Sequence, residues 1–397
     1  MLVELPKLLN RRTVLKNILT MEIQEVEAKV TTALPPCCLR IFRDEFTLVG
    51  TYELDKPTGN RTGSIDIYDS DLKLIHTYPT YGAILDLKLS PFDDTLMATA
   101  HSTGNVMLWQ LKVTDNDITI ELISNLFAFE SDTLITSLHF SPLEQNLICV
   151  TTTTGESATF DIISGKETFS SNTIKESYDK IDTKTVNVQG KEVSGIDTIM
   201  ETFNEVHGLE CWTAEFGQLA PLQNVLFTGG DDSTIMAHDL RSKEAIWSNG
   251  RIHEAGVVGI KCSSPTFRNN RPTSIITGSY DDNIRNIDLR MLGESLYPGK
   301  NTPAGSIISK NLGGGVWRFS EVPVSCKEGS VDKLMVCCMY DGAKIVSLDE
   351  SQRNSEYFQV NNFLKKGHES MCYGGDWNSS FIATCSFYDK SLQKWNV

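Results

Sequence analysis

The stretch TGGDDSTIMAHDLR at residues 228–241 returns almost unchanged as TGSYDDNIRNIDLR at residues 277–290. Both copies open with Thr-Gly, carry acidic residues in the middle and close with Asp-Leu-Arg. Each copy reads as a β-rich run, a turn and an alternating strand, because Asp and Asn side chains hydrogen-bond nearby backbone and tolerate turn dihedrals. We therefore predict two equivalent hairpins of a repeat protein.

The same register recurs along the rest of the chain. His238 and Ile287 occupy matching places just before the closing Asp-Leu-Arg, and five other segments offer an equivalent residue. The seven reference residues are Tyr68, Trp109, Phe160, His238, Ile287, Leu348 and Trp395. Most are separated by roughly 40 to 50 residues, the length of a four-stranded propeller blade. The sequence thus predicts an all-β fold, a seven-bladed β-propeller over residues 25–397.

The repeat resembles the WD repeat. Trp109 and Trp395 occupy the usual tryptophan place, and His253 and His368 stand where the histidine of such repeats usually stands. The resemblance implies that each histidine bonds the turn aspartate of its own blade, and that an N-terminal strand completes the last blade. The turn aspartates are Asp281 for His253 and Asp389 for His368, and the strand is EAKVTTAL at residues 27–34. Closure of this kind removes two exposed sheet edges.

Two segments fall outside the repeat. Residues 1–24 are predicted as a short N-terminal extension with helical character, since leucines alternate with Lys and Arg over residues 1–20. An organelle-targeting helix, a helix docked on the body, a frayed extension and initiation at Met21 remain alternatives. Residues 164–207 are polar and acidic with few aromatics, and we predict an exposed insertion between blades.

Composition narrows the class of protein. The 397 residues carry a net charge of −15, which argues against non-specific binding to nucleic acid or anionic lipid. No apolar stretch reaches the roughly 18 residues of a membrane span. The ten cysteines include no CxxC pair, so we expect reduced, buried thiols in a cytoplasmic protein and no structural zinc. We expect no metal, no cofactor and no stable membrane insertion.

Common catalytic motifs are missing from the sequence. We find no G-x-S-x-G, no G-x-G-x-x-G, no G-x-x-x-x-G-K-S/T and no H-E-x-x-H. Their absence argues against conventional serine hydrolases, nucleotide enzymes and zincins. Catalysis stays possible, because a catalytic constellation is defined by geometry and can be assembled from several blades.

Three segments are less well explained by the repeat. In LGGGVWRFS at residues 312–320, we predict that Arg318 lies near the mouth of the central channel, where it could clamp a carboxylate or an oxyanion. The alternative is a tight loop with Trp317 packed between blades. LECWTAEFG at residues 209–217 reads either as an inner strand or as an acidic, aromatic contact surface.

The third segment is HESMCYGGDW at residues 368–377. Tyr373, Asp376 and Trp377 combine aromatic faces with a carboxylate, which suits a quaternary ammonium ligand through cation–π attraction. Packing between blades would use the same residue types, so both interpretations stay open.

Five motifs together resemble the diphthine methylesterase family of WD-repeat proteins. They are GTYELD (50–55), GSYDDNI (278–284), GGGVWR (313–318), YGGDW (373–377) and ATCSFYD (383–389). LPPCCLRIF (34–42) and ILDLKLSPFDDTL (84–96) look like its fungal members. The resemblance runs from about residue 34 to the C-terminus.

Membership would imply a carboxylic ester hydrolase of diphthamide biosynthesis. Its substrate would be methylated diphthine, a trimethylammonium-bearing histidine derivative on translation elongation factor 2 in the cytoplasm. Some fungal relatives are also linked to endosomal recycling, which makes endosomal trafficking proteins candidate partners. The alternative is a non-catalytic WD-repeat adaptor that gathers partners on its rims, since propellers host both kinds of function.

Under the resemblance we assign expected roles to named residues. Arg318 is expected to stabilise the oxyanion, and His253 or His368 to act as the base. The substrate-binding residues are expected to be Trp317, Tyr373, Asp376 and Trp377. No family motif fixes a nucleophile, so attack by water and attack by a side chain both remain open.

Overall fold

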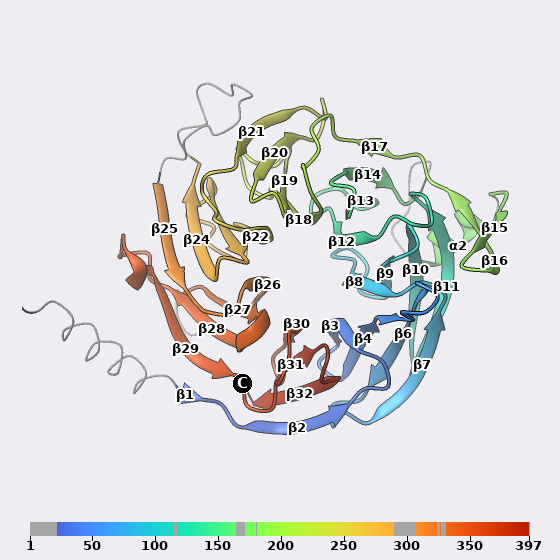
Figure 1. The fold of residues 1–397 in the computed structure, drawn as a ribbon, viewed down its shortest axis with the longest axis horizontal. Helices are drawn as coiled ribbons and strands as arrows, with labels where there is room; N and C mark the ends of the chain where they lie inside the picture. Colours follow the sequence, from blue (N-terminus) through green and yellow to red (C-terminus); the bar gives the residue numbers. More distant parts are fainter. Residues whose placement is uncertain are drawn as a thin grey trace, which may run out of the picture.

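The computed structural model describes residues 22–114, 117–163, 171–179, 181–289, 306–323, 326 and 331–396. Their strands form seven sheets in a ring around a central axis (Figure 1). The structure is therefore a seven-bladed β-propeller, as the sequence predicts. Most of the predicted N-terminal extension, up to residue 21, lies outside the described residues.

Each blade runs from an inner strand at the axis to an outer strand at the rim. Blade 1 contains β3 (Pro36–Phe42), β4 (Phe46–Thr51), β6 (Arg61–Tyr68) and β7 (Leu74–Thr80); blade 2 contains β8 (Ile84–Leu89), β9 (Leu96–His101), β10 (Asn105–Thr114) and β11 (Asp117–Phe127). Blade 3 contains β12 (Ile135–Phe140), β13 (Leu147–Thr152), β14 (Ser157–Asp161) and β17 (Glu201–Thr202); blade 4 contains β18 (Cys211–Phe216), β19 (Val225–Gly230), β20 (Ile235–Asp239) and β21 (Ala245–Asn249).

The remaining three blades follow the same order. Blade 5 contains β22 (Val257–Cys262), β23 (Ser274–Ser279), β24 (Asn283–Asp288) and β25 (Ser306–Asn311); blade 6 contains β26 (Val316–Glu321), β27 (Lys333–Cys338), β28 (Gly342–Leu348) and β29 (Phe358–Leu364). Blade 7 contains β30 (Cys372–Trp377), β31 (Phe381–Ser386), β32 (Ser391–Asn396) and, as its outer strand, β2 (Val26–Thr31). Smaller elements are β1 (Glu22–Ile23), β5 (Glu53–Leu54), β15 (Lys184–Val188), β16 (Lys191–Asp197), α2 (Ser171–Tyr178), η3 (Met339–Asp341) and η4 (Ser355–Tyr357).

The repeat register read from the sequence is confirmed. All seven reference residues lie in the third strand of their blade, on β6, β10, β14, β20, β24, β28 and β32. Trp395 and Ile287 are both fully buried, although one is tryptophan and the other isoleucine. The position therefore requires a side chain that can be buried between neighbouring sheets; six of the seven are apolar or aromatic, and the seventh, His238, is buried with its Nε2 bonded to Thr228.

The strand that closes the ring is also the expected one. β2 pairs antiparallel with β32, with Val26 opposite Trp395 and Thr31 opposite Ser391. One sheet thus joins a strand near the start of the chain to its last strand, and β2 covers the edge that β32 would otherwise expose.

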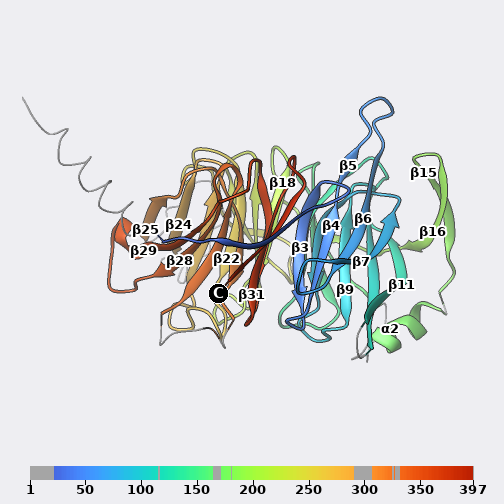
Figure 2. The same cartoon turned by 90° about the horizontal axis from the view of Figure 1, so that it is seen from below.

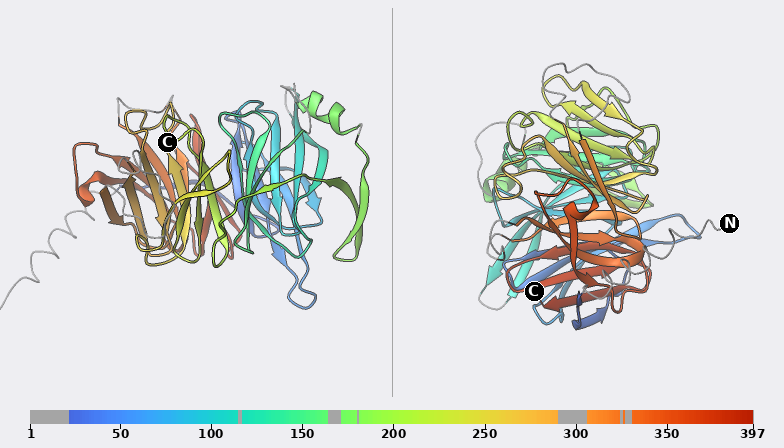
Figure 3. Two further views of the ribbon diagram at one scale, coloured as in Figure 1. Left: turned by 90° about the horizontal axis from the view of Figure 1, so that it is seen from above. Right: turned by 90° about the vertical axis from the view of Figure 1, so that its left-hand side faces the viewer.

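The segment predicted as an insertion between blades is partly built into them. β16 extends blade 2 by pairing with β11, and β17 is the outer strand of blade 3. At the turn between β15 and β16, the Gln189 side chain accepts a hydrogen bond from the Arg61 backbone N–H (2.6 Å) and donates to the Tyr81 carbonyl (3.1 Å). The tip of this hairpin and the loop after β5 project on one face, whereas α2 lies on the other (Figures 2 and 3).

Every inner strand has a register irregularity at its second residue. The seven residues involved are Cys37, Leu85, Thr136, Trp212, Val258, Trp317 and Tyr373. A bulge leaves its extra residue out of the ladder and turns that side chain away from the sheet. The repeated bulge therefore sends one side chain per blade toward the channel.

Among the described residues, no helix is long and apolar enough to cross a membrane.

Candidate active site

Two cavities lie at the axis of the ring, and both are lined by inner-strand residues. The larger, of about 560 Å³, contains six of the seven bulged residues, so it lies toward the starts of the inner strands. The smaller, of about 280 Å³, extends toward the strand ends. We call them the aromatic chamber and the charged chamber. Trp212, Trp317 and Arg318 line both, which makes these residues the boundary between them.

The aromatic chamber takes its name from seven rings. They are Tyr52, Trp212, Tyr280, Trp317, Tyr373, Phe387 and Tyr388. Trp317 is central, with ring centres 5.2 Å from Tyr373, 5.8 Å from Trp212 and 5.9 Å from Tyr280. Aromatic faces that converge in this way attract a cation, above all a poorly hydrated quaternary ammonium.

Arg318 extends from blade 6 toward blade 2. Its guanidinium donates from Nη1 to Asp86 Oδ1 at 2.5 Å and from Nη2 to the Leu85 carbonyl at 3.2 Å. These two hydrogen bonds fix the direction of the guanidinium. Three of the five N–H groups of Arg318 are left for other acceptors. The side chain is 19% exposed, so a ligand in either chamber could reach it.

Asp86 is a buried carboxylate held by several donors. Besides Arg318, it accepts from Lys88 Nζ (3.0 Å) and from the Leu138 backbone N–H (3.0 Å). Burial alone would raise the pKa of Asp86, but Arg318 and Lys88 outweigh burial and hold the pKa far below its ordinary value. Burial, together with Arg40, lowers the pKa of Lys88 to about 8. Asp86 therefore stays ionised and keeps Arg318 in place.

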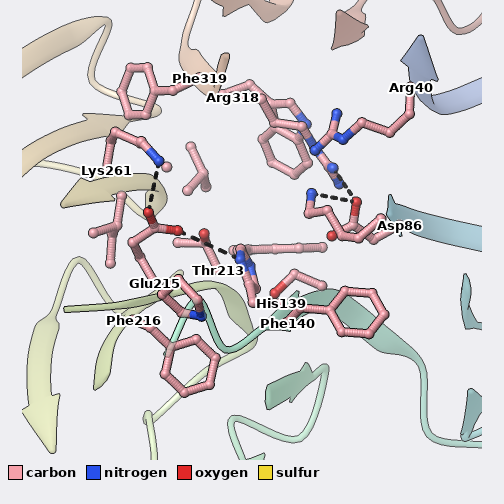
Figure 4. Close-up of a pocket in the computed structure, with 18 of the residues that line it drawn as sticks. Arg40, Asp86, His139, Phe140, Thr213, Glu215, Phe216, Lys261, Arg318 and Phe319 are labelled. Atoms are coloured by element: carbon pink, nitrogen blue, oxygen red, sulfur yellow. Dashed lines mark hydrogen bonds and ion pairs between the residues drawn. The ribbon is translucent and has the colours of Figure 1, made fainter. Parts of the chain in front are cut away.

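The fifth residue of every inner strand is polar, and all of these except Ser320 and Asp376 line the charged chamber. The seven residues are Arg40, Lys88, His139, Glu215, Lys261, Ser320 and Asp376. Lys261 lies between two carboxylates, 3.1 Å from Glu215 and 2.9 Å from Glu321. Figure 4 shows this pair on one side of the cavity and the Asp86–Arg318 pair on the other.

His139 lies between these two groups of charges. Its Nδ1 is 3.8 Å from Glu215 Oε2, and its Nε2 is buried with no hydrogen-bond partner among the described residues. Burial is the main reason that the pKa of His139 falls to about 3, and Lys88 adds to the effect. The imidazole is therefore neutral at physiological pH.

Comparison with known proteins identifies the family. A Saccharomyces cerevisiae protein named diphthine methyltransferase is 59% identical over 377 residues, which cover 93% of this chain and 97% of the yeast protein. The chain belongs to the diphthine methyltransferase family. The resemblance seen in the sequence is thus confirmed at the level of the family.

Other comparisons agree with this assignment. A Schizosaccharomyces pombe diphthine methyltransferase is 30% identical over 90% of this chain and 92% of its own length. A chain in the crystal structure of the mitotic checkpoint complex matches 100% of this chain with a TM-score of 0.61, but at 12% identity this likeness shows the fold alone. A scan against protein-family models found no match.

In this diphthine methyltransferase family member, three of the predicted site residues come together. Arg318 and Trp317 line both chambers, and Tyr373 lines the aromatic chamber. Asp376 does not line either one: it accepts hydrogen bonds from the Ile41 backbone N–H and from Ser320 Oγ, both at 2.9 Å. Trp377 packs against a buried core cluster that joins blades 6 and 7.

The two predicted histidine bases lie away from both chambers. His253 Nε2 bonds Thr277 Oγ1 at 2.9 Å, and His368 Nε2 bonds Thr384 Oγ1 at 2.6 Å. The expected side-chain bonds to the turn aspartates are not formed. The Asp281 carboxylate binds Arg285 instead, at 2.9 and 2.7 Å. Catalysis by His253 or His368 therefore stays a prediction from sequence position.

Sequence reasoning missed several residues of the chambers. Tyr280 follows β23 in the same turn position that Tyr52 and Phe387 occupy after β4 and β31. Comparison of these turns could have identified all three as chamber residues. Asp86 and His139 gave no such signal, because their roles depend on partners in other blades.

Proposed function

We propose that this protein hydrolyses the methyl ester of methylated diphthine on translation elongation factor 2. Family membership supports an enzyme of the diphthamide pathway, because the yeast relatives are named diphthine methyltransferases. Loss of the ester methyl group would leave diphthine with a free carboxylate. The substrate is a residue of a larger protein, so it must enter through an open mouth of the channel.

The observation that carries the proposal is that Arg318 lies beside the aromatic chamber. Methylated diphthine bears a trimethylammonium group close to its ester. Trp317 and Tyr373 offer aromatic faces to such a cation, while the neighbouring Arg318 can donate to the ester oxygen. A donor that meets the oxygen as negative charge develops lowers the barrier by about 3 kcal/mol. Asp376 and Trp377 do not contact the substrate in this proposal; they hold β30, which carries Tyr373, in place.

Hydrolysis needs only water, whereas methyl transfer needs a second molecule to give or take the methyl group. The chain has no G-x-G-x-x-G loop of the kind that binds a nucleotide cofactor. Methylated diphthine carries a cation and an ester close together. The aromatic chamber suits the cation, and the charged chamber suits the ester. These features favour hydrolysis over transfer.

One experiment separates the two reactions. Elongation factor carrying methylated diphthine is incubated with the protein in heavy-oxygen water, and both products are analysed by mass spectrometry. Attack on the carbonyl carbon places heavy oxygen in the new carboxylate and releases ordinary methanol. Loss of the methyl group without heavy oxygen in either product would indicate transfer to an acceptor. Tight binding without any loss of methyl would favour the adaptor.

A further inference from the structure

We propose that the charged chamber is the second half of the catalytic site, in which His139 acts as general base toward the attacking water and Glu215 positions its ring. This inference rests on the proposed ester hydrolysis. It assigns a function to the chamber that does not hold the ammonium group. Arg318 connects the two halves, since it lines both chambers.

His139 is the one histidine that lines either chamber, and the structure describes all seven histidines of the chain. The other six lie outside both chambers and each has a bonded ring nitrogen, although Nδ1 of His238, His253 and His368 is also buried without a partner among the described residues. His76 bonds Asp117, His101 bonds Thr99, His207 bonds Asp232, His238 bonds Thr228, His253 bonds Thr277 and His368 bonds Thr384. A base for chemistry in the channel is therefore available at His139.

The free nitrogen of His139 points to a ligand or a water molecule. A buried polar atom is nearly always hydrogen-bonded, so an unpaired buried nitrogen needs an explanation. Nε2 of His139 has no partner among the described residues, and the cavity beside it is polar and large enough for water. The neutral ring can accept a proton there.

A chain of charges lies on the other side of the imidazole. Glu215 Oε2 is 3.8 Å from His139 Nδ1, and Lys261 anchors Glu215 at 3.1 Å while also contacting Glu321 at 2.9 Å. A short movement would bring the carboxylate within hydrogen-bonding distance of Nδ1–H. That bond would leave the lone pair on Nε2 and stabilise the imidazolium that forms during reaction.

The proposed step conserves atoms and charge. The water oxygen attacks the ester carbonyl carbon while Nε2 takes one water proton, and the carbonyl oxygen becomes an oxyanion that Arg318 stabilises. The tetrahedral intermediate then expels the methoxy group, which takes the proton from Nε2–H and leaves as methanol. The acid product loses its own proton to solvent. Cys37, which lines the aromatic chamber, is a poor nucleophile because burial raises the pKa of its thiol to about 12.

The central test compares His139→Gln with a matched control, His76→Gln, which changes a partly exposed histidine outside both chambers. We expect His139→Gln to lower kcat by about 100-fold or more with little change in KM. His76→Gln should keep wild-type kinetics. Added imidazole should restore part of the activity to His139→Ala, since that variant leaves room for the free base. Glu215→Gln should lower kcat less than His139→Gln does.

A pH profile provides a readout that a purely structural role would not change. The charged groups that act on His139 are Lys88, Asp86, Arg318, Arg40 and Glu215. Removal of one positive charge in Lys88→Met should move the acidic limb of the kcat profile to higher pH. Wild-type hydrolysis with an unchanged rate in folded His139→Gln would overturn the inference alone. Absence of hydrolysis by the wild type would instead overturn the proposed function.

Discussion

At the scale of single residues, the proposed role of Arg318 sets two requirements that are hard to meet together. Arg318 must stay charged inside the protein, and it must keep donors free for a ligand. Asp86 meets the first demand by sharing one buried carboxylate between Arg318 and Lys88. The planar guanidinium meets the second, because its five N–H groups exceed what Asp86 and Leu85 use.

Substitution of Arg318 tests its proposed role in stabilising the oxyanion. Arg318→Lys keeps the positive charge beside Asp86 but loses the forked donors. We expect kcat/KM to fall by about 100-fold, with a modest loss of stability. Kinetics with the methylated elongation factor and thermal unfolding measure the two effects separately. An unchanged kcat/KM in a folded variant would exclude Arg318 from catalysis.

Asp86 should make stability depend on acid pH. Its pKa is lower in the folded state than in the unfolded state, so it contributes stability above the unfolded pKa of about 3.9, and this contribution is lost as the pH falls. Asp86→Asn should lower the free energy of unfolding at neutral pH by about 3 kcal/mol. It should also flatten the stability curve between about pH 5 and pH 2. Urea unfolding at several pH values measures both, and a parallel shift would contradict the argument.

His368 allows a test of the base predicted from the sequence. It bonds Thr384, which also accepts from Trp395 Nε1 at 2.8 Å, inside blade 7. His368→Gln should therefore destabilise the fold by about 1 kcal/mol and leave kcat unchanged per folded molecule. A large loss of kcat at wild-type stability would instead support the catalytic role.

At the scale of elements, we expect the closing strand β2 to stabilise the whole fold, although it has only six residues. It supplies the outer strand of blade 7 and covers the edge of β32. Deletion of residues 1–31 should expose that edge, lower the urea midpoint and cause concentration-dependent aggregation. Deletion of residues 1–25, which removes β1 and keeps β2, is the matched control. Equal stability of the two truncated proteins would contradict the assigned role of β2.

The third strands and the closing strand could be predicted from the sequence because their signals are local. A turn aspartate, an apolar strand and a fixed spacing identify a hairpin wherever it occurs. The charged chamber could not be predicted in this way. His139 and Glu215 are 76 positions apart in the sequence and meet only because their inner strands share one bulged register.

At the scale of the whole molecule, the two chambers exist only when the ring is closed. The aromatic chamber draws residues from blades 1 to 7, and Arg318 of blade 6 meets Asp86 of blade 2 across the axis. No pair of neighbouring blades contains both a donor for the oxyanion and the carboxylate that holds it. The proposed site is thus a property of the closed propeller.

This dependence predicts that activity and global structure are lost together. Urea should abolish hydrolysis at the same midpoint at which tryptophan fluorescence reports unfolding, because Trp212 and Trp317 lie at the boundary of the two chambers. Deletion of β2 should shift both midpoints downward by the same amount, whereas Arg318→Lys should lower the rate without separating them. Rates and fluorescence are measured on the same samples. Activity lost well before the fluorescence change would mean that one mobile element controls the site, and that ring closure alone does not create it.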